Sequence, residues 1–116
     1  MDRLFKEMAK PIKIYLAKEE ILDPYEKNVS LTMLNPIPIK AIISDLTFAK
    51  MQWAMPGIVA DKAKEIEIQI RHKSLLEMSQ KIEIDGEFYE GWRQNSKMQT
   101  RKEGNYLRCY IYLKKV

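Results

Sequence analysis

The sequence has few of the residues that build chemical sites. It contains one cysteine, Cys109, and one histidine, His72, which leaves no partner for an intrachain disulfide and no spacing typical of a zinc site. No glycine-rich phosphate loop and no nucleophile elbow occurs. We therefore predict that the protein is not an enzyme and has no catalytic residue, metal or cofactor. A lone cysteine fits a reducing compartment.

Long apolar runs are also lacking. No run approaches the ~20 residues that span a membrane, and residues 1–10 lack the apolar core of a secretion signal. We expect synthesis in the cytoplasm and no membrane partner. The net charge is +4, but the part from Arg93 onward carries +6 and residues 1–92 carry −2. This basic third favours an acidic partner, either nucleic acid or an acidic protein face, and a solvated basic surface is equally compatible.

Residues 66–92 give the firmest structural prediction. Alternating isoleucines between residues 66 and 70 are typical of a half-buried strand. The pair Asp85-Gly86 between two strand-like runs predicts a two-residue hairpin turn, because a type I′ turn needs positive φ at both positions. Phe88 and Trp92 are expected to face the core after this turn, with Gly91 as a possible bulge. Residues 72–79 are read as a polar crossover.

Similar alternation predicts strands at residues 12–16, 29–33, 37–43 and 106–113. Residues 2–9 predict a short helix. Residues 17–27 and 93–102 are read as polar connections, the first with a turn at Asp23-Pro24. Many short strands in 116 residues predict one domain, residues 1–116, that is mainly β: a small antiparallel barrel or sandwich with a short N-terminal helix in residues 1–10.

Residues 45–64 form an unusually long and apolar connection, although Ser44-Asp45 begins a marginal helical pattern that reaches about Gln52. Long loops in compact domains are usually functional or disordered. Two interpretations stay open: the loop folds over its own core, or it rearranges on assembly. Its candidate assembly residues are Phe48, Met51, Trp53, Met55, Pro56, Gly57 and Ile58.

The last predicted strand has an apolar face and an aromatic, cationic face. The apolar face places Cys109 in the core. The second face is a candidate interface made of Tyr106, Arg108, Tyr110 and Tyr112. Protein contact, base stacking with single-stranded nucleic acid and simple exposure are three interpretations of it. Acidic residues in the two central strand regions fall on the outward phase and are expected to be solvated, and His72 is expected in a surface turn. These acidic residues are Glu65, Glu67, Glu83, Asp85, Glu87 and Glu90.

The order of these parts resembles the head-closure proteins of long-tailed phages, also called stoppers or head–tail joining proteins. The resemblance covers roughly residues 36–113. It rests on a strand leading into a loop (residues 39–52), the Pro56-Gly57 turn, a strand and crossover (residues 66–80), and the hairpin motif IEIDGEFYEGW followed by a last strand that ends in basic residues.

This resemblance implies a non-enzymatic virion protein of the phage neck. It implies a small β-barrel that assembles as a ring, expected to be a hexamer, although the isolated chain can be a monomer. The expected partners are portal or adaptor ring proteins and tail terminator or tail tube proteins, with non-specific contact to packaged DNA. The closing segment would be residues 45–61. Two alternatives remain: a tail-completion or terminator protein of the neck, and a small barrel that binds single-stranded nucleic acid.

Overall fold

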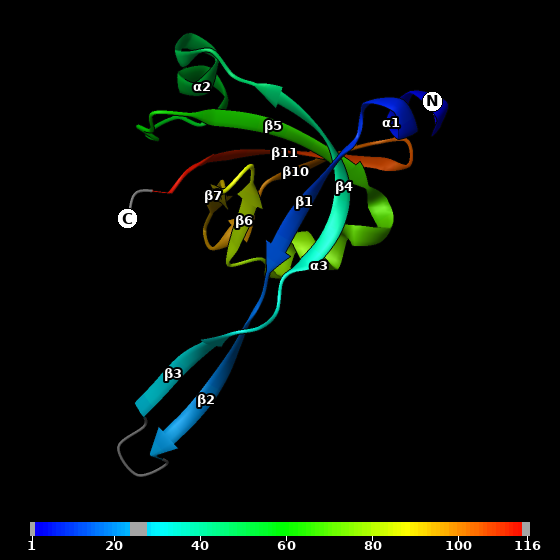
Figure 1. Cartoon of the computed structure of the whole chain (residues 1–116). Helices are drawn as coiled ribbons and strands as arrows, with labels where there is room; N and C mark the ends of the chain where they lie inside the picture. Colours follow the sequence, from blue (N-terminus) through cyan, green and yellow to red (C-terminus); the bar gives the residue numbers. More distant parts are fainter. Residues whose placement is uncertain (1, 24–27, 115–116) are drawn as a thin grey trace.

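The computed structural model describes residues 2–23 and 28–114 and contains a closed, six-stranded antiparallel β-barrel (Figure 1). The predicted mainly-β barrel is therefore confirmed. Neighbouring strands follow the order β11-β5-β4-β1-β6-β7, and β7 pairs back onto β11 to close the barrel. The barrel strands are β1 (Lys10–Tyr15), β4 (Ile37–Asp45), β5 (Ala63–Gln69), β6 (Lys81–Ile84), β7 (Glu87–Gly91) and β11 (Tyr106–Leu113).

The barrel core is filled by the inward residues of these strands. Side chains alternate between the two faces of a strand, so each isoleucine pattern in the sequence becomes one wall of the core. Ile14 of β1 lies opposite Ile82 of β6, and both are fully buried. The buried core residues are Ile12, Ile14, Ile39, Ala41, Ile66, Ile68, Leu76, Ile82, Ile84, Tyr89, Met98, Leu107, Cys109 and Ile111.

The β6–β7 hairpin turns at Asp85 and Gly86, whose φ values of 50° and 80° confirm the predicted type I′ turn. The prediction that Phe88 and Trp92 enter the same core is wrong. Because the turn has two residues, Ile82 lies opposite Tyr89, and Tyr89 is the aromatic residue that is fully buried. Phe88 points the other way and packs edge-on against Tyr15, with ring centroids 5.8 Å apart.

Gly91 is not a bulge, because it pairs with Ile111 in an unbroken register between β7 and β11. It leaves room for Met98: a Cβ at position 91 would lie 2.2 Å from the Met98 Cε atom. Met98 belongs to a region that the sequence suggested was a connection without strands. That region contains the short strands β8 (Arg93–Gln94) and β9 (Lys97–Met98), followed by β10 (Thr100–Glu103), which pairs with β11 outside the closed barrel.

Two short helices cover the barrel. The crossover between β5 and β6 is helical, with the 3-10 turn η1 (Ile70–His72) leading into α3 (Lys73–Met78). Leu76 of α3 is completely buried in the barrel core. The predicted N-terminal helix is confirmed as α1 (Asp2–Met8), whose Phe5 ring lies 5.1 Å from the ring of Tyr106.

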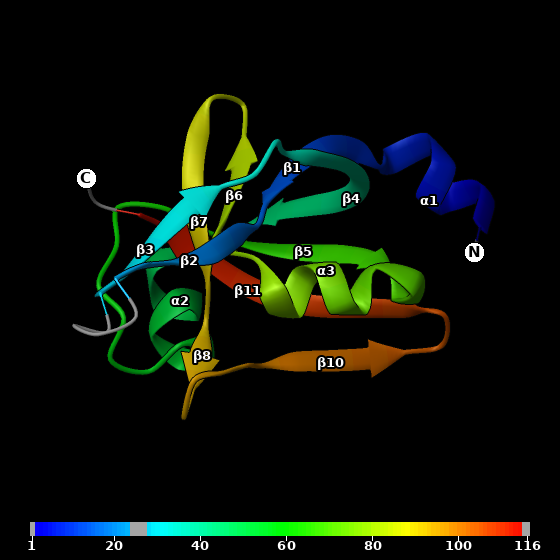
Figure 2. The same cartoon turned by 90° about the horizontal axis from the view of Figure 1, so that it is seen from below.

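A two-stranded arm projects from the barrel, away from α1 (Figure 1). It consists of β2 (Ala17–Asp23) and β3 (Asn28–Met33), so the expected connection at residues 17–27 contains a strand. The turn predicted at Asp23-Pro24 falls partly on residues 24–27, which lie outside the described residues. The arm lengthens the molecule: the radius of gyration is 15.4 Å, whereas a compact chain of this length has about 13 Å. Figure 2 shows the arm in front of the barrel.

Candidate assembly surface

The connection between β4 and β5 contains a helix, α2 (Phe48–Ala54), and is not a continuous loop. Because β4 continues to Asp45, the helix cannot begin at Ser44-Asp45. Its N-cap is Thr47, whose hydroxyl oxygen accepts a hydrogen bond from the Lys50 amide at 3.2 Å. The predicted Pro56-Gly57 turn follows, where Gly57 has φ 87° and the Ile58 amide donates to the Met55 carbonyl at 3.1 Å.

The two faces of α2 differ sharply. Met51 and Met55, four residues apart, point inward and are 2% and 0% exposed. Phe48 and Trp53 point outward and are 69% and 78% exposed. The inner residues form a separate small core, called here the α2 cluster. Its buried members are Met51, Ala54, Met55, Ala60 and Ala63, and partly buried Leu46, Ile58, Trp92, Tyr110 and Tyr112 pack against them.

The α2 cluster joins two sets of residues that the sequence suggested separately. Tyr110 and Tyr112 lie beneath the α2 segment, so half of the aromatic face of β11 is covered by the connection. Burial is the main cause that raises the pKa of both tyrosines. The Tyr112 hydroxyl also donates to a carboxylate oxygen of Glu90 at 2.9 Å, which raises its pKa further.

The other half of this face is also occupied. Tyr106 is 6% exposed and packs against Phe5. The Arg108 guanidinium lies 3.0 Å from a Glu67 carboxylate oxygen, 3.2 Å from Glu103 and 3.8 Å from Glu65. Burial works to lower the pKa of Arg108, but the hydrogen bond that Arg108 donates to Glu67 and the three neighbouring carboxylates leave it raised. The charge of Arg108 is therefore already paired with three carboxylates.

Other predicted outward carboxylates likewise have partners. The Glu83 carboxylate accepts from the Tyr15 hydroxyl at 2.7 Å, which is the main cause of the raised pKa of Tyr15. Glu87 accepts from Lys62 at 2.8 Å. The Tyr15–Glu83 contact joins the neighbouring strands β1 and β6, as expected of an outward sheet face, and the Lys62–Glu87 contact is a surface ion pair.

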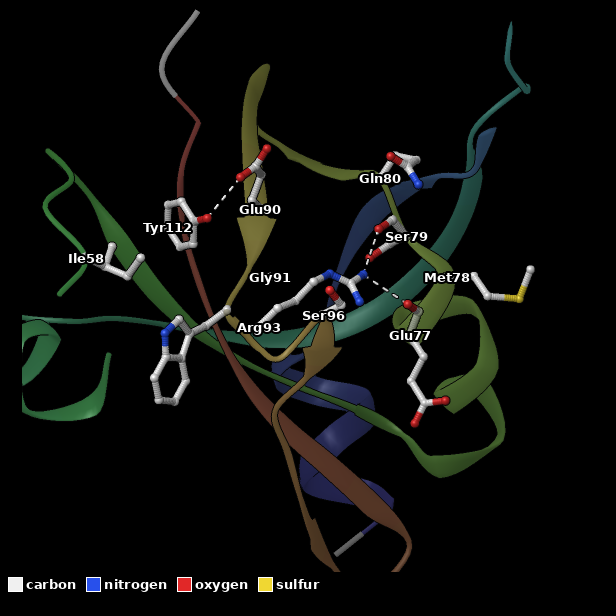
Figure 3. Close-up of a pocket in the computed structure, with 11 residues that line it drawn as sticks. Ile58, Glu77, Met78, Ser79, Gln80, Glu90, Gly91, Arg93, Ser96 and Tyr112 are labelled. Carbon is white, nitrogen blue, oxygen red and sulfur yellow. Dashed lines mark hydrogen bonds between the residues drawn. The ribbon is translucent and has the colours of Figure 1, made fainter. Parts of the chain in front are cut away.

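A pocket of about 460 Å³ opens between the end of α3, the β7–β8 corner and the α2 segment (Figure 3). Its wall on one side includes Ile58 and the Glu90–Tyr112 hydrogen bond. On the other side, the Arg93 Nη2 atom donates to the carbonyls of Glu77 and Ser79 at 2.9 and 3.0 Å. These bonds satisfy carbonyls at the C-terminus of α3.

The single histidine and the single cysteine both lie in surroundings typical of structural residues. His72 lies at the η1–α3 junction, where its ring accepts a hydrogen bond from Arg71. Its pKa is lowered by burial and by the Arg71 charge. Cys109 is 2% exposed, which confirms its core position, and burial raises the pKa of its thiol to about 12. Within the described residues, no group of three or more His, Cys, Asp or Glu side chains is arranged to hold a metal ion.

The roles of several residues of this surface were not predicted from the sequence. Trp92 packs against the α2 cluster instead of the barrel core. Arg93 donates hydrogen bonds to carbonyls at the end of α3, which lie 14 to 16 residues earlier in the chain. No local pattern marks either role. Thr47 did carry a signal, because a threonine directly before an apolar run is a typical N-cap. No helix in the described part of the chain is long and apolar enough to cross a membrane.

Comparisons with known proteins returned no match to a family model, to a curated protein or to a solved structure.

Proposed function

We propose that this chain is a structural protein of the phage head–tail connector that assembles as a ring and acts in head closure. In this role the ring binds below the portal or adaptor ring, retains the packaged DNA and presents a surface to the tail. A hexamer is the expected stoichiometry, taken from the resemblance to head-closure proteins. Contact with DNA is non-specific in this proposal.

The observation that carries the proposal is that α2 has an anchored inner face and also exposes two large aromatic side chains. Phe48 and Trp53 expose large apolar surfaces on a segment that joins two barrel strands. Large aromatic side chains are the most frequent energetic anchors of protein interfaces. Because the segment is tethered at both ends, it can exchange its small intramolecular cluster for contacts in a ring without altering the barrel.

For α2 to rearrange on assembly, the contacts that hold it in place must first be broken. Its attachment depends on Met51 and Met55, with three alanines contributing little surface to the cluster. Methionine packs adaptably, so the same side chains fit a second environment with little strain. A closing segment of this kind is folded before assembly and is released by its partners, in contrast to a loop that is disordered until the ring forms.

The first test places the protein in the particle. Virions of the phage that carries this gene are purified, disrupted into DNA-filled heads and free tails, and probed by mass spectrometry. We expect the chain in the head fraction, and we expect heads made without it to lose DNA to added nuclease. Recovery in the tail fraction would instead support the tail-completion or terminator alternative. Absence from both fractions would refute a connector role.

The second test addresses the two exposed aromatic side chains of α2. The double variant Phe48→Ala with Trp53→Ala should fold, because both residues are exposed, but should fail to protect DNA in heads. Val59→Ala is the matched control, since Val59 is 74% exposed on the same segment. Full protection by the double variant would contradict the assigned role of α2. Salt-dependent oligonucleotide binding that Tyr110→Ala with Tyr112→Ala abolishes would support the nucleic-acid alternative instead.

A further inference from the structure

The arm has a strand edge without a partner. Within residues 2–23 and 28–114, β2 pairs with β3 and with no other strand, and the two form a separate two-stranded sheet. A hairpin alone is marginally stable in water, and it normally gains stability from a third strand or a packed face. In the described part of the chain the arm projects from the barrel and has no third strand (Figure 1).

The barrel region has a matching open edge at β10. In the described part of the chain, β10 pairs with β11 on one side only and ends the strand order of the main sheet (Figure 2). The two-residue turn at Gly104 and Asn105 sets Glu103 opposite Tyr106. Antiparallel ladders alternate, so the backbone N–H and C=O of Lys102 point away from β11, toward the open edge. An exposed edge of this kind is a template for pairing with another strand.

The charges of the two edges are opposite. The sequence of β2 contains three acidic residues, Glu19, Glu20 and Asp23, and one basic residue, whereas β3 has no charged residue. Around β10 the exposed cations are Lys97, Arg101 and Lys102. The one carboxylate of β10, on Glu103, is already paired with Arg101 and with Arg108. Opposite charges across a strand pair stabilise it, and like charges destabilise it.

We propose that β2 of one copy adds to the open edge of β10 in a second copy of this chain. The arm is directed away from the barrel, so β2 and β10 of the same copy do not meet (Figure 1). The contact joins two different surfaces, and such head-to-tail contacts close into rings when the rotation allows it. The inference rests on the proposed function for its ring, and it names the element that links neighbouring copies.

The basic residues of β10 also protect its open edge against pairing with most other strands. Lysine and arginine on an edge strand discourage pairing with strands in general. An acidic strand is the exception, because it gains from the same charges that repel other partners. The edge is thus selective for β2 over β3 and over a second β10.

Carbodiimide cross-linking tests the contact directly, because the reagent joins carboxylates to lysine amines that touch. Concentrated ¹⁵N-labelled and unlabelled chains are mixed, cross-linked and digested. We expect mixed-isotope peptides that join the acidic residues of β2 to Lys97 or Lys102. The Lys62–Glu87 pair, 2.8 Å apart within one chain, is the internal control for the reagent and should give unmixed peptides. Absence of mixed β2–β10 links while the control link forms overturns the proposal.

A charge-swap experiment sharpens the test. One chain carries Arg101→Glu with Lys102→Glu, and the other carries Glu19→Arg with Glu20→Arg. Each alone places like charges on both edges, so intermolecular association measured by light scattering and cross-linking should fall roughly tenfold or more. An equal mixture restores opposite charges at every contact and should regain the association of the unmodified chain. Failure of the mixture to recover, with both chains folded, contradicts the proposed pairing.

The matched control is Lys40→Glu with Arg71→Glu, which changes the net charge equally at two exposed positions outside both edges. It should associate like the unmodified chain. The outcomes separate this inference from the proposed function. Rings that form without β2–β10 links would refute the edge contact and leave head closure standing. Links in a chain that is absent from virions would support the contact and refute the connector role.

Discussion

The barrel core and the α2 cluster differ in the residues from which they are built. Eight of the fourteen buried residues of the barrel core are isoleucines, whereas the α2 cluster buries two methionines and three alanines. Isoleucine is stiff at χ1 and fits one packed arrangement, whereas methionine is flexible and fits several. The first composition favours one rigid structure, and the second favours a contact that can be exchanged.

The two regions also differ in how their backbones are held. Each barrel strand pairs with a neighbour on both sides, so opening one strand disrupts two ladders. The helix α2 has seven residues, and a helix of that length is unstable by itself. Its stability in place therefore comes from the α2 cluster. Local opening of α2 should cost much less free energy than opening of the barrel.

The largest expected effect lies in the barrel. Ile14→Ala removes a fully buried side chain between two paired strands and should lower the free energy of unfolding by about 2–5 kcal/mol, measured by urea denaturation. Val59→Ala, at an exposed position of the α2 segment, should change it by less than about 0.5 kcal/mol. A loss below about 1 kcal/mol for Ile14→Ala would show that the barrel core is as adaptable as the α2 cluster.

The next effect comes from Cys109, also in the barrel core. Burial raises the pKa of its thiol from 9.0 to about 12. The unfolded chain therefore loses this proton first, so the stabilising contribution is present below pH 9 and is lost as the pH rises toward 12. Between pH 8 and pH 11 we expect Cys109 to account for a loss of about 3 kcal/mol. The loss of stability between pH 8 and pH 11 should be smaller by that amount in Cys109→Ala, and an equal loss in both proteins would contradict burial of the thiol.

The barrel was largely predictable from the sequence because its signals are local. Alternating isoleucines mark the inward face of each strand, and Asp85-Gly86 marks the turn. The inward position of Tyr89 could also have been predicted from the sequence. Two-residue turn geometry already sets position 89 opposite position 82, and the error arose from following aromatic residues instead of the register.

The candidate assembly surface was only partly predictable because its contacts are made between distant segments. The spacing of Met51 and Met55 predicts a common helical face, but the cover that Tyr110 and Tyr112 provide depends on where β11 lies in the barrel. The same holds for Arg108, whose three carboxylate neighbours come from β5 and β10. The residue types of β11 suggested an open cationic face, whereas strand pairing brings carboxylate partners next to Arg108.

A smaller effect on overall stability than in the barrel core should come from Met51→Ala, which tests whether the two regions open independently. The substitution removes a buried side chain from the middle of α2, in a cluster that is separate from the barrel core. Amide hydrogen exchange in residues 48–54 should accelerate roughly tenfold or more, which corresponds to about 1.4 kcal/mol of local stability. Exchange in β1, β5 and β11 should stay unchanged where those strands open locally with α2 still in place, and the global free energy of unfolding should fall by about the same 1.4 kcal/mol.

Lys50→Ala is the control for this substitution, because Lys50 is exposed on the same helix and its backbone amide remains capped by Thr47. It should leave exchange in α2 within about twofold, since alanine is at least as good a helix former as lysine. If Met51→Ala instead accelerates exchange in α2 and in the barrel strands by the same factor, the α2 cluster and the barrel core form one cooperative unit. In that case α2 could not be released on assembly without unfolding the barrel, and another segment would have to make the contacts assigned to it.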